Sequence, residues 1–174
     1  MFRILLSISF MFFFLIAPAQ VSKIDIPMKN GKVYYEKTYE LTPGLQQHEL
    51  YKRALKWFKQ GEKNTGKIKT SSDKTGEIIG TGIFKIVTSN TGNYYLVRFI
   101  IDIKTHNGGY TFSASGFYEK PIESGISNEY SKIEYRWWDY RQGKPWSAED
   151  EALFKGIAAD ENALMGSLED KMKI

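Results

Sequence analysis

The 174-residue sequence contains no cysteine and only two histidines, and these absences exclude several kinds of chemistry. Without a thiol, neither a cysteine nucleophile nor a disulfide framework can form. His48 and His106 lie far apart and lack the paired spacing of a zinc site, so we expect both on the surface. No Gly-x-Ser-x-Gly elbow occurs, and no complete Gly-x-x-x-x-Gly-Lys-Ser/Thr phosphate loop does, since Ile68 follows the Gly-Lys pair at 66–67. We therefore predict no catalytic residues, no metal site and no cofactor.

The N-terminus reads as an export signal. Arg3 precedes an almost wholly apolar run from Ile4 to Ile16, which is too short to span a bilayer comfortably. Small residues at 17–19 then predict cleavage after Ala19, giving a signal peptide at 1–19 and a mature chain from Gln20 without a membrane span; an uncleaved anchor is the alternative. No cysteine follows the run, which excludes a lipoprotein anchor. We expect an exported protein, periplasmic or secreted.

The charge balance of the mature chain is weak. Removing Arg3 with the signal leaves 23 basic and 20 acidic residues, a net charge near +3. This mild excess favours solubility over binding to a polyanion. Together with the export signal, it predicts that nucleic acid is not a partner.

One helix and one strand, between Leu45 and Ile86, organise the predicted fold. Apolar residues recur at helical spacing and form one stripe on the helix: Leu50, Tyr51, Ala54, Leu55 and Phe58. Trp57 widens this stripe. The strand that follows alternates, and one of its faces holds Ile78, Gly80, Gly82, Phe84 and Ile86. Two glycines on one strand face indicate that another group approaches closely. We expect the Trp57 end of the helix to cover Gly80 and Gly82, so that a larger residue at Gly82 lowers stability.

The remaining segments predict an antiparallel sheet and a second helix. Strands are expected at 33–39, around Ile68 as a lysine-rich edge, at 94–106, at 110–118 and near 133–138, with a hairpin turn at 107–109. Ser147 caps a long amphipathic helix that runs to about Met172. The pattern predicts an α+β fold, a curved antiparallel sheet with both helices on one face. We expect a single domain at 20–174 with its core at 33–118.

A family resemblance supports this order of elements. The segment ELYKRALKWF, a short polar stretch, GEIIGTGIF and a long strand ending in a Gly-Gly turn and YTFS resemble the domain of unknown function 4468 family. The resemblance covers roughly Val33 to Tyr118. It implies a TBP-like fold and an exported bacterial protein of unassigned function, and it supplies no site residues. The name of the fold does not imply DNA binding.

Two surfaces are candidates for ligand binding. If both helices cover the face of Val97, the opposite face of the same strand presents Tyr94, Leu96, Arg98 and Ile100. Apolar residues exposed on a sheet often mark a partner surface, although the segment from Tyr130 to Trp146 or the N-terminal lead-in is an equally good candidate to cover them. The second surface contains Trp137 and Trp138. On a strand these neighbours point in opposite directions, so one of them is free to stack on a sugar or peptide unless both pack against the long helix.

Two functions of different classes follow from these surfaces. The first is a non-enzymatic module of the cell envelope that binds an envelope protein or peptide. The second is a carbohydrate-binding or hydrolytic protein that uses the Trp137 and Trp138 region. No pair of acidic residues stands out for glycoside hydrolysis.

Overall fold

The computed structural model describes residues 26–61, 64–123, 125, 129–143 and 146–173. The predicted signal peptide and its cleavage site lie outside these residues. The elements in chain order are β1 (Met28–Lys29), β2 (Lys32–Glu40), α1 (Gln47–Lys59), β3 (Thr65–Ser72), β4 (Glu77–Val87), β5 (Tyr94–His106), β6 (Gly109–Ile122), β7 (Ser131–Lys132), α2 (Glu134–Arg141) and α3 (Ala148–Lys173). None of the helices in the described part is long and apolar enough to cross a membrane.

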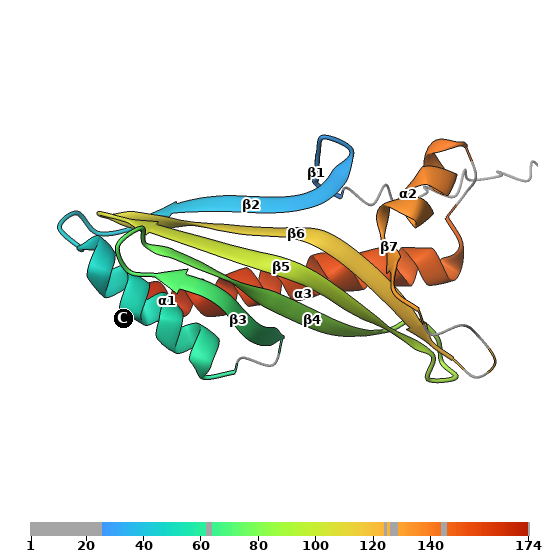
Figure 1. The fold of residues 1–174 in the computed structure, drawn as a ribbon. Helices are drawn as coiled ribbons and strands as arrows, with labels where there is room; N and C mark the ends of the chain where they lie inside the picture. Colours follow the sequence, from blue (N-terminus) through green and yellow to red (C-terminus); the bar gives the residue numbers. More distant parts are fainter. Residues whose placement is uncertain (1–25, 62–63, 124, 126–128, 144–145, 174) are drawn as a thin grey trace, which may run out of the picture.

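The strands form one antiparallel sheet in the order β1-β2-β6-β5-β4-β3, as Figure 1 shows. The predicted edge strand around Ile68 is β3, and Asn107-Gly108 closes the β5–β6 hairpin. β7 pairs with β6 at Tyr118 and Glu119, beyond the last residue of β6 that pairs with β2. The predicted antiparallel sheet is therefore confirmed, with the additional short strands β1 and β7.

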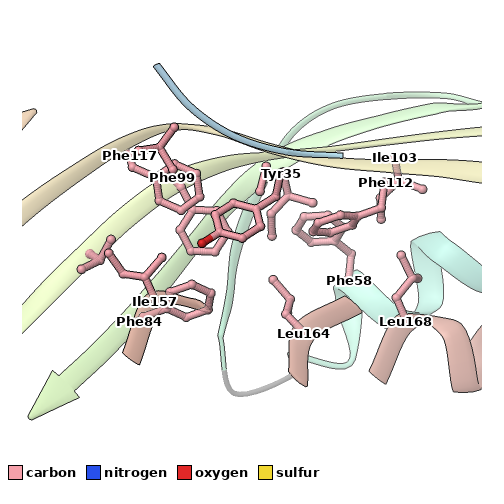
Figure 2. Packing of buried hydrophobic residues seen from close by; sticks show 14 of the residues in the cluster. Tyr35, Phe58, Phe84, Phe99, Ile103, Phe112, Phe117, Ile157, Leu164 and Leu168 are labelled. Atoms are coloured by element: carbon pink, nitrogen blue, oxygen red, sulfur yellow. The ribbon is translucent and has the colours of Figure 1, made fainter. Parts of the chain in front are cut away.

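Both predicted helices cover the same face of the sheet. α1 contacts β4 and β5, while α3 contacts β4 and α1. Side chains between the layers meet as Figure 2 shows, with Phe84, Phe99 and Phe112 from the strands facing Ile157, Leu164 and Leu168 from α3. The ring centroids of Phe99 lie 4.5 Å from Phe84 and 5.0 Å from Phe117. Ser147 caps α3 as predicted, its hydroxyl oxygen accepting from the Asp150 N–H at 3.0 Å.

A β-bulge at Gly116 shifts the alternation of β6. Gly116 has φ +63°, and the register of the β5–β6 pair shifts between Arg98 and Ile100. A bulge places one extra residue on one strand, so every later side chain changes face. Regular alternation along the strand expected at 110–118 would place Gly116 and Tyr118 on the face of Phe112, and this expectation is therefore wrong. Phe117 takes the buried position, and Tyr118 turns to the other side.

The prediction of a strand near 133–138 is also wrong. Ile133 is fully buried, and the helix α2 begins at the next residue. Alternating charged and aromatic residues suit a strand, but the helical turn lets Glu134 and Arg136 bond to neighbouring parts of the fold. Contacts with the rest of the molecule thus override the local pattern.

The two glycines of β4 are covered, but not by Trp57. Trp57 is fully buried between the helices, where its indole N–H donates to the Ser167 hydroxyl of α3 at 3.0 Å. A Cβ at Gly80 would lie 2.6 Å from the ring of Phe58, the next residue of α1, and one at Gly82 would lie 2.2 Å from the ring of Phe99 on β5. The prediction that the Trp57 end of α1 covers the two glycines is therefore confirmed at Gly80, through Phe58, and wrong at Gly82, where the neighbour is Phe99.

Replacing Gly82 with alanine is expected to lower the free energy of unfolding by about 1–3 kcal/mol, the usual cost of overpacking a core. Phe99 is 1% exposed and held between two other rings, so it has no room to move aside. Gly166→Ala is the control, because a Cβ there meets nothing within 4 Å; in a helix it should stabilise by about 0.5–1 kcal/mol. Urea unfolding measures both variants, and a Gly82→Ala protein as stable as the parent would contradict the packing.

A carboxyl group lies inside the core at Glu161 of α3. The residue is fully buried, and neither of its carboxylate oxygens has a partner among the described residues. Burial, reinforced by the charge of Asp160, raises the pKa of Glu161 well above its usual range. Tyr35 of β2 is also affected: burial and then the Glu161 charge raise its pKa. Glu161 is thus a destabilising group whenever it is ionised.

The stability is expected to fall as the pH rises above about 4.5, the ordinary pKa of glutamate, because the folded protein holds this proton more tightly than the unfolded chain. Glu161→Gln should raise the melting temperature at pH 8 by about 3 °C or more, the shift that roughly 1 kcal/mol gives at this size. At pH 4 the gain should vanish, since both states are then protonated. Asp170→Asn, an exposed change on the same helix, is the control; an equal gain at both pH values would refute this account.

Candidate binding surface

The four predicted residues of β5 lie together on the face of the sheet opposite the helices, here called the open face. Tyr94, Leu96 and Ile100 are partly exposed and Arg98 is exposed, and they alternate with buried neighbours such as Val97. The strict alternation of a strand produces this arrangement, because packing of the helices on one face leaves the other to solvent.

Arg98 is held between two tyrosine rings on the open face. Its guanidinium carbon lies 4.0 Å from the ring centroid of Tyr130 and 5.0 Å from that of Tyr118. Tyr118 stands beside Arg98 in the strand register, and it reaches this face only because of the bulge at Gly116. The sequence left open that the segment from Tyr130 to Trp146 covers the predicted residues. Tyr130 does cover Arg98, because its ring packs against the guanidinium. Arg136 of the same segment contacts Tyr95, on the buried side of β5.

A hollow of about 310 Å³ lies beside Arg98 on the open face. Its floor is partly apolar, and cationic and hydroxyl groups surround it; the lining residues are Lys69, Thr81, Arg98, Phe99, Ile100, Gly116 and Tyr118. The missing side chain of Gly116 leaves this space open. None of the lining residues is a histidine or an acid, so the hollow offers hydrogen-bond donors to a ligand and no carboxylate or imidazole for proton transfer. Gly116 and Tyr118 were not predicted, since their position depends on the bulge. Lys69 was not predicted because it lies at a separate irregularity in the β3–β4 pairing.

The predicted tryptophans occupy a second surface on α2, at one end of the sheet (Figure 1). Trp137 packs against Trp146 and Phe154, with ring centroids at 5.5 and 6.2 Å. Trp138 is 59% exposed and Tyr135 63%. Neighbouring side chains on a helix point about 100° apart, which turns one tryptophan inward and the other outward. An apolar hollow of about 480 Å³ lies here, lined by Gly31, Glu134, Tyr135, Trp137 and Trp138.

Polar contacts fix α2 to the rest of the molecule. The Glu134 carboxylate accepts from the Val33 backbone N–H at 3.0 Å. The Arg136 guanidinium donates to Glu119 at 3.0 Å, to Asp150 at 2.6 Å and to the Tyr95 hydroxyl at 2.8 Å. Burial opposes the charge of Arg136, but the bonds to Asp150 and Glu119 outweigh it and raise its pKa, so it remains a cation. These contacts hold in place the helix that carries the exposed rings of Tyr135 and Trp138.

The two histidines lie where the sequence predicted, on the surface and apart from both hollows. His48 has its Nδ1 2.6 Å from a carboxylate oxygen of Asp73, and His106 is exposed. Among the described residues no group of three histidine or acidic side chains is placed to hold a metal ion.

Comparison with solved structures shows that the fold is shared. A crystal structure of a DUF4468 family protein from Bacteroides ovatus superposes with a TM-score of 0.71 at 18% identity, covering 88% of this chain and 93% of that one. A TBP-like protein from Parabacteroides distasonis superposes with a TM-score of 0.67, also at 18% identity, covering 84% and 96%. Among curated proteins nothing matches. At such low identity these structures establish the TBP-like architecture and say nothing of a ligand.

The family expected from the sequence is confirmed by its model. The model for a domain of unknown function with a TBP-like fold matches residues 25–120, which extends the predicted resemblance on its N-terminal side through β1. This match covers more than half of the 174 residues and includes α1, the glycine-bearing β4 and the β5–β6 hairpin. The chain belongs to the DUF4468 family.

Proposed function

We propose that the protein is a non-enzymatic binding module of the bacterial cell envelope that recognises a protein or peptide segment on its open face. The observation that carries this proposal is the hollow beside Arg98, on a face that the helices leave uncovered. The export signal expected at 1–19 supports a partner outside the cytoplasm.

The chemistry of the open face suits a polypeptide ligand. Leu96 and Ile100 are aliphatic and partly exposed on either side of Arg98, which allows an extended chain to bury apolar side chains. Tyr118 and Arg98 supply hydrogen-bond donors for backbone carbonyls or polar side chains. Aromatic residues and arginine are the residue types that contribute most at protein interfaces.

A library of random ten-residue peptides displayed on phage should yield binders to the immobilised protein. Leu96→Ser combined with Ile100→Ser should weaken the selected peptides at least ten-fold, because it removes apolar contact area without touching the core. Tyr135→Ser combined with Trp138→Ser is the matched control on α2 and should leave binding unchanged. Thermal unfolding checks that both variants fold. Failure to recover any binder, or loss of binding only in the α2 variant, would overturn the proposal.

Carbohydrate binding at α2 is the second candidate. The exposed rings of Trp138 and Tyr135 border an apolar hollow, and such rings stack on the faces of sugars. The hydrolytic form of this candidate has less support, since glycoside hydrolysis commonly uses two carboxylates. Glu134 is the one acid among the residues lining this hollow, and its Oε1 already accepts from Val33.

Affinity electrophoresis in gels containing bacterial or plant polysaccharides should show retardation of the protein if α2 binds glycans. Trp138→Ala should abolish that retardation while leaving the melting temperature unchanged, because Trp138 is mostly exposed. Tyr94→Ala, on the open face, should migrate as the parent. Parental migration unaffected by every polysaccharide would remove this candidate.

A further inference from the structure

We infer that the segment bound by the open face is acidic: an extended peptide whose aspartate or glutamate side chains meet the cations around Arg98. This inference rests on the proposed function and adds the class of ligand. Three observations support it. The charges on the open face are separated by sign, the cations around Arg98 lack ion-pair partners among the described residues, and a hollow lies beside these cations.

The strand register places positive charges together at one end of the open face. Arg98 pairs across with Ile83 and Tyr118, and Tyr118 pairs with Lys132 of β7. The next outward row contains Lys85, Leu96 and Lys120. We call Arg98, Lys85, Lys120 and Lys132, with Lys69 at the hollow, the basic end. The outward positions of β4, β5, β6 and β7 from the Arg98 row to the Tyr94 row include no acid.

The opposite end of the same face carries the acids. Glu77 pairs across with Lys104, and two residues further along the strands Asp102 lies between Ile79 and Ser113. Glu77, Asp102 and Glu36 already have partners within the protein, whereas Glu40, opposite Gly109, has no ion pair among the described residues. Lys104 lies 3.2 Å from Glu77 and 3.6 Å from Asp102, and Glu36 lies 3.6 Å from Lys29.

The cations of the basic end have no such partners. None of the five forms an ion pair with a carboxylate among the described residues; three of them instead lie over tyrosine rings. Lys85 is 4.2 Å from the ring centroid of Tyr94, Lys120 is 5.7 Å from that of Tyr130, and Arg98 lies between Tyr118 and Tyr130. Contacts of this kind contribute only about 0.5–1 kcal/mol at exposed sites and leave N–H donors free. The rings therefore hold the cations in place without neutralising them.

An acidic peptide complements this arrangement better than a second copy of the chain does. A second copy would have to supply its acidic end, where Lys104 and Lys29 already compensate three of the four outward carboxylates. A peptide with free carboxylates gains charge-assisted hydrogen bonds to Arg98, and its apolar side chains can rest on Leu96 and Ile100. The hollow of about 310 Å³ has room for one side chain between Lys69 and Arg98.

The test compares the peptides selected by phage display with their amide counterparts. Selected sequences should be enriched in aspartate and glutamate, and changing these residues to asparagine and glutamine should weaken binding at least ten-fold in fluorescence anisotropy. Affinity should also fall as salt rises from 50 to 200 mM, because the charges lie at the surface. Arg98→Gln with Lys120→Gln should reproduce the loss. Lys52→Gln with Lys59→Gln, an equal change of charge on α1, should not.

Each result separates the two levels of the proposal. Peptides that bind the open face without enrichment in acidic residues would overturn the acidic ligand and leave the proposed function standing. The same holds for peptides that bind equally well after asparagine and glutamine replace their acidic residues. Recovery of no peptide would overturn both. Sedimentation showing a dimer of the free protein that Arg98→Gln dissociates would assign the basic end to a second copy. Binding to phosphatidylglycerol vesicles without any acidic peptide would assign it to a membrane, and either result would refute the inference.

Discussion

The structure depends on one constraint: a single face of the sheet is buried, and two helices from different parts of the chain share the task of burying it. α1 and α3 are joined by the indole of Trp57, which is fully buried and bonded to Ser167. The aromatic layer of Phe84, Phe99 and Phe117 lies beneath them. Because apolar burial is the main favourable term in folding, this layer stabilises the fold, and the helices leave the other face of the sheet uncovered.

The two faces of β5 differ in burial and in composition. Its buried residues are almost all apolar or aromatic, whereas the outward ones combine aliphatic, aromatic and charged side chains. The bulge at Gly116 contributes to both faces, because it moves Phe117 into the core and Tyr118 beside Arg98. A net charge of only +4 for the whole chain conceals the separation of charges on the open face. Composition argued against a polyanion partner, and the local arrangement of cations favours an anionic one.

Much of the fold could be predicted from the sequence, because long periodic segments dominate it. The helix ending near Lys59, the glycine strand, the β5–β6 hairpin and the C-terminal helix all follow from spacing of apolar residues. The errors lie where tertiary contacts decide. Local pattern does not reveal the bulge at Gly116, and the strand expected near Ile133 is a helix because Arg136 finds Glu119 and Asp150. Tyr94, Leu96, Arg98 and Ile100 were grouped correctly, since alternation alone places them, whereas Lys69 and Tyr118 required the three-dimensional register.

The position of α3 in the sequence has a consequence for how the molecule is made. This helix comprises residues 148–173 and covers the aromatic layer together with α1, yet it is synthesised after the whole sheet. Until α3 is synthesised, the rings of Phe84 and Phe99 remain partly exposed to water. A chain without α3 therefore exposes an apolar sheet face that is prone to aggregation. If the chain crosses a membrane before it folds, that hazard is postponed until both the sheet and α3 have reached the far side, where the helix can close the interior at once.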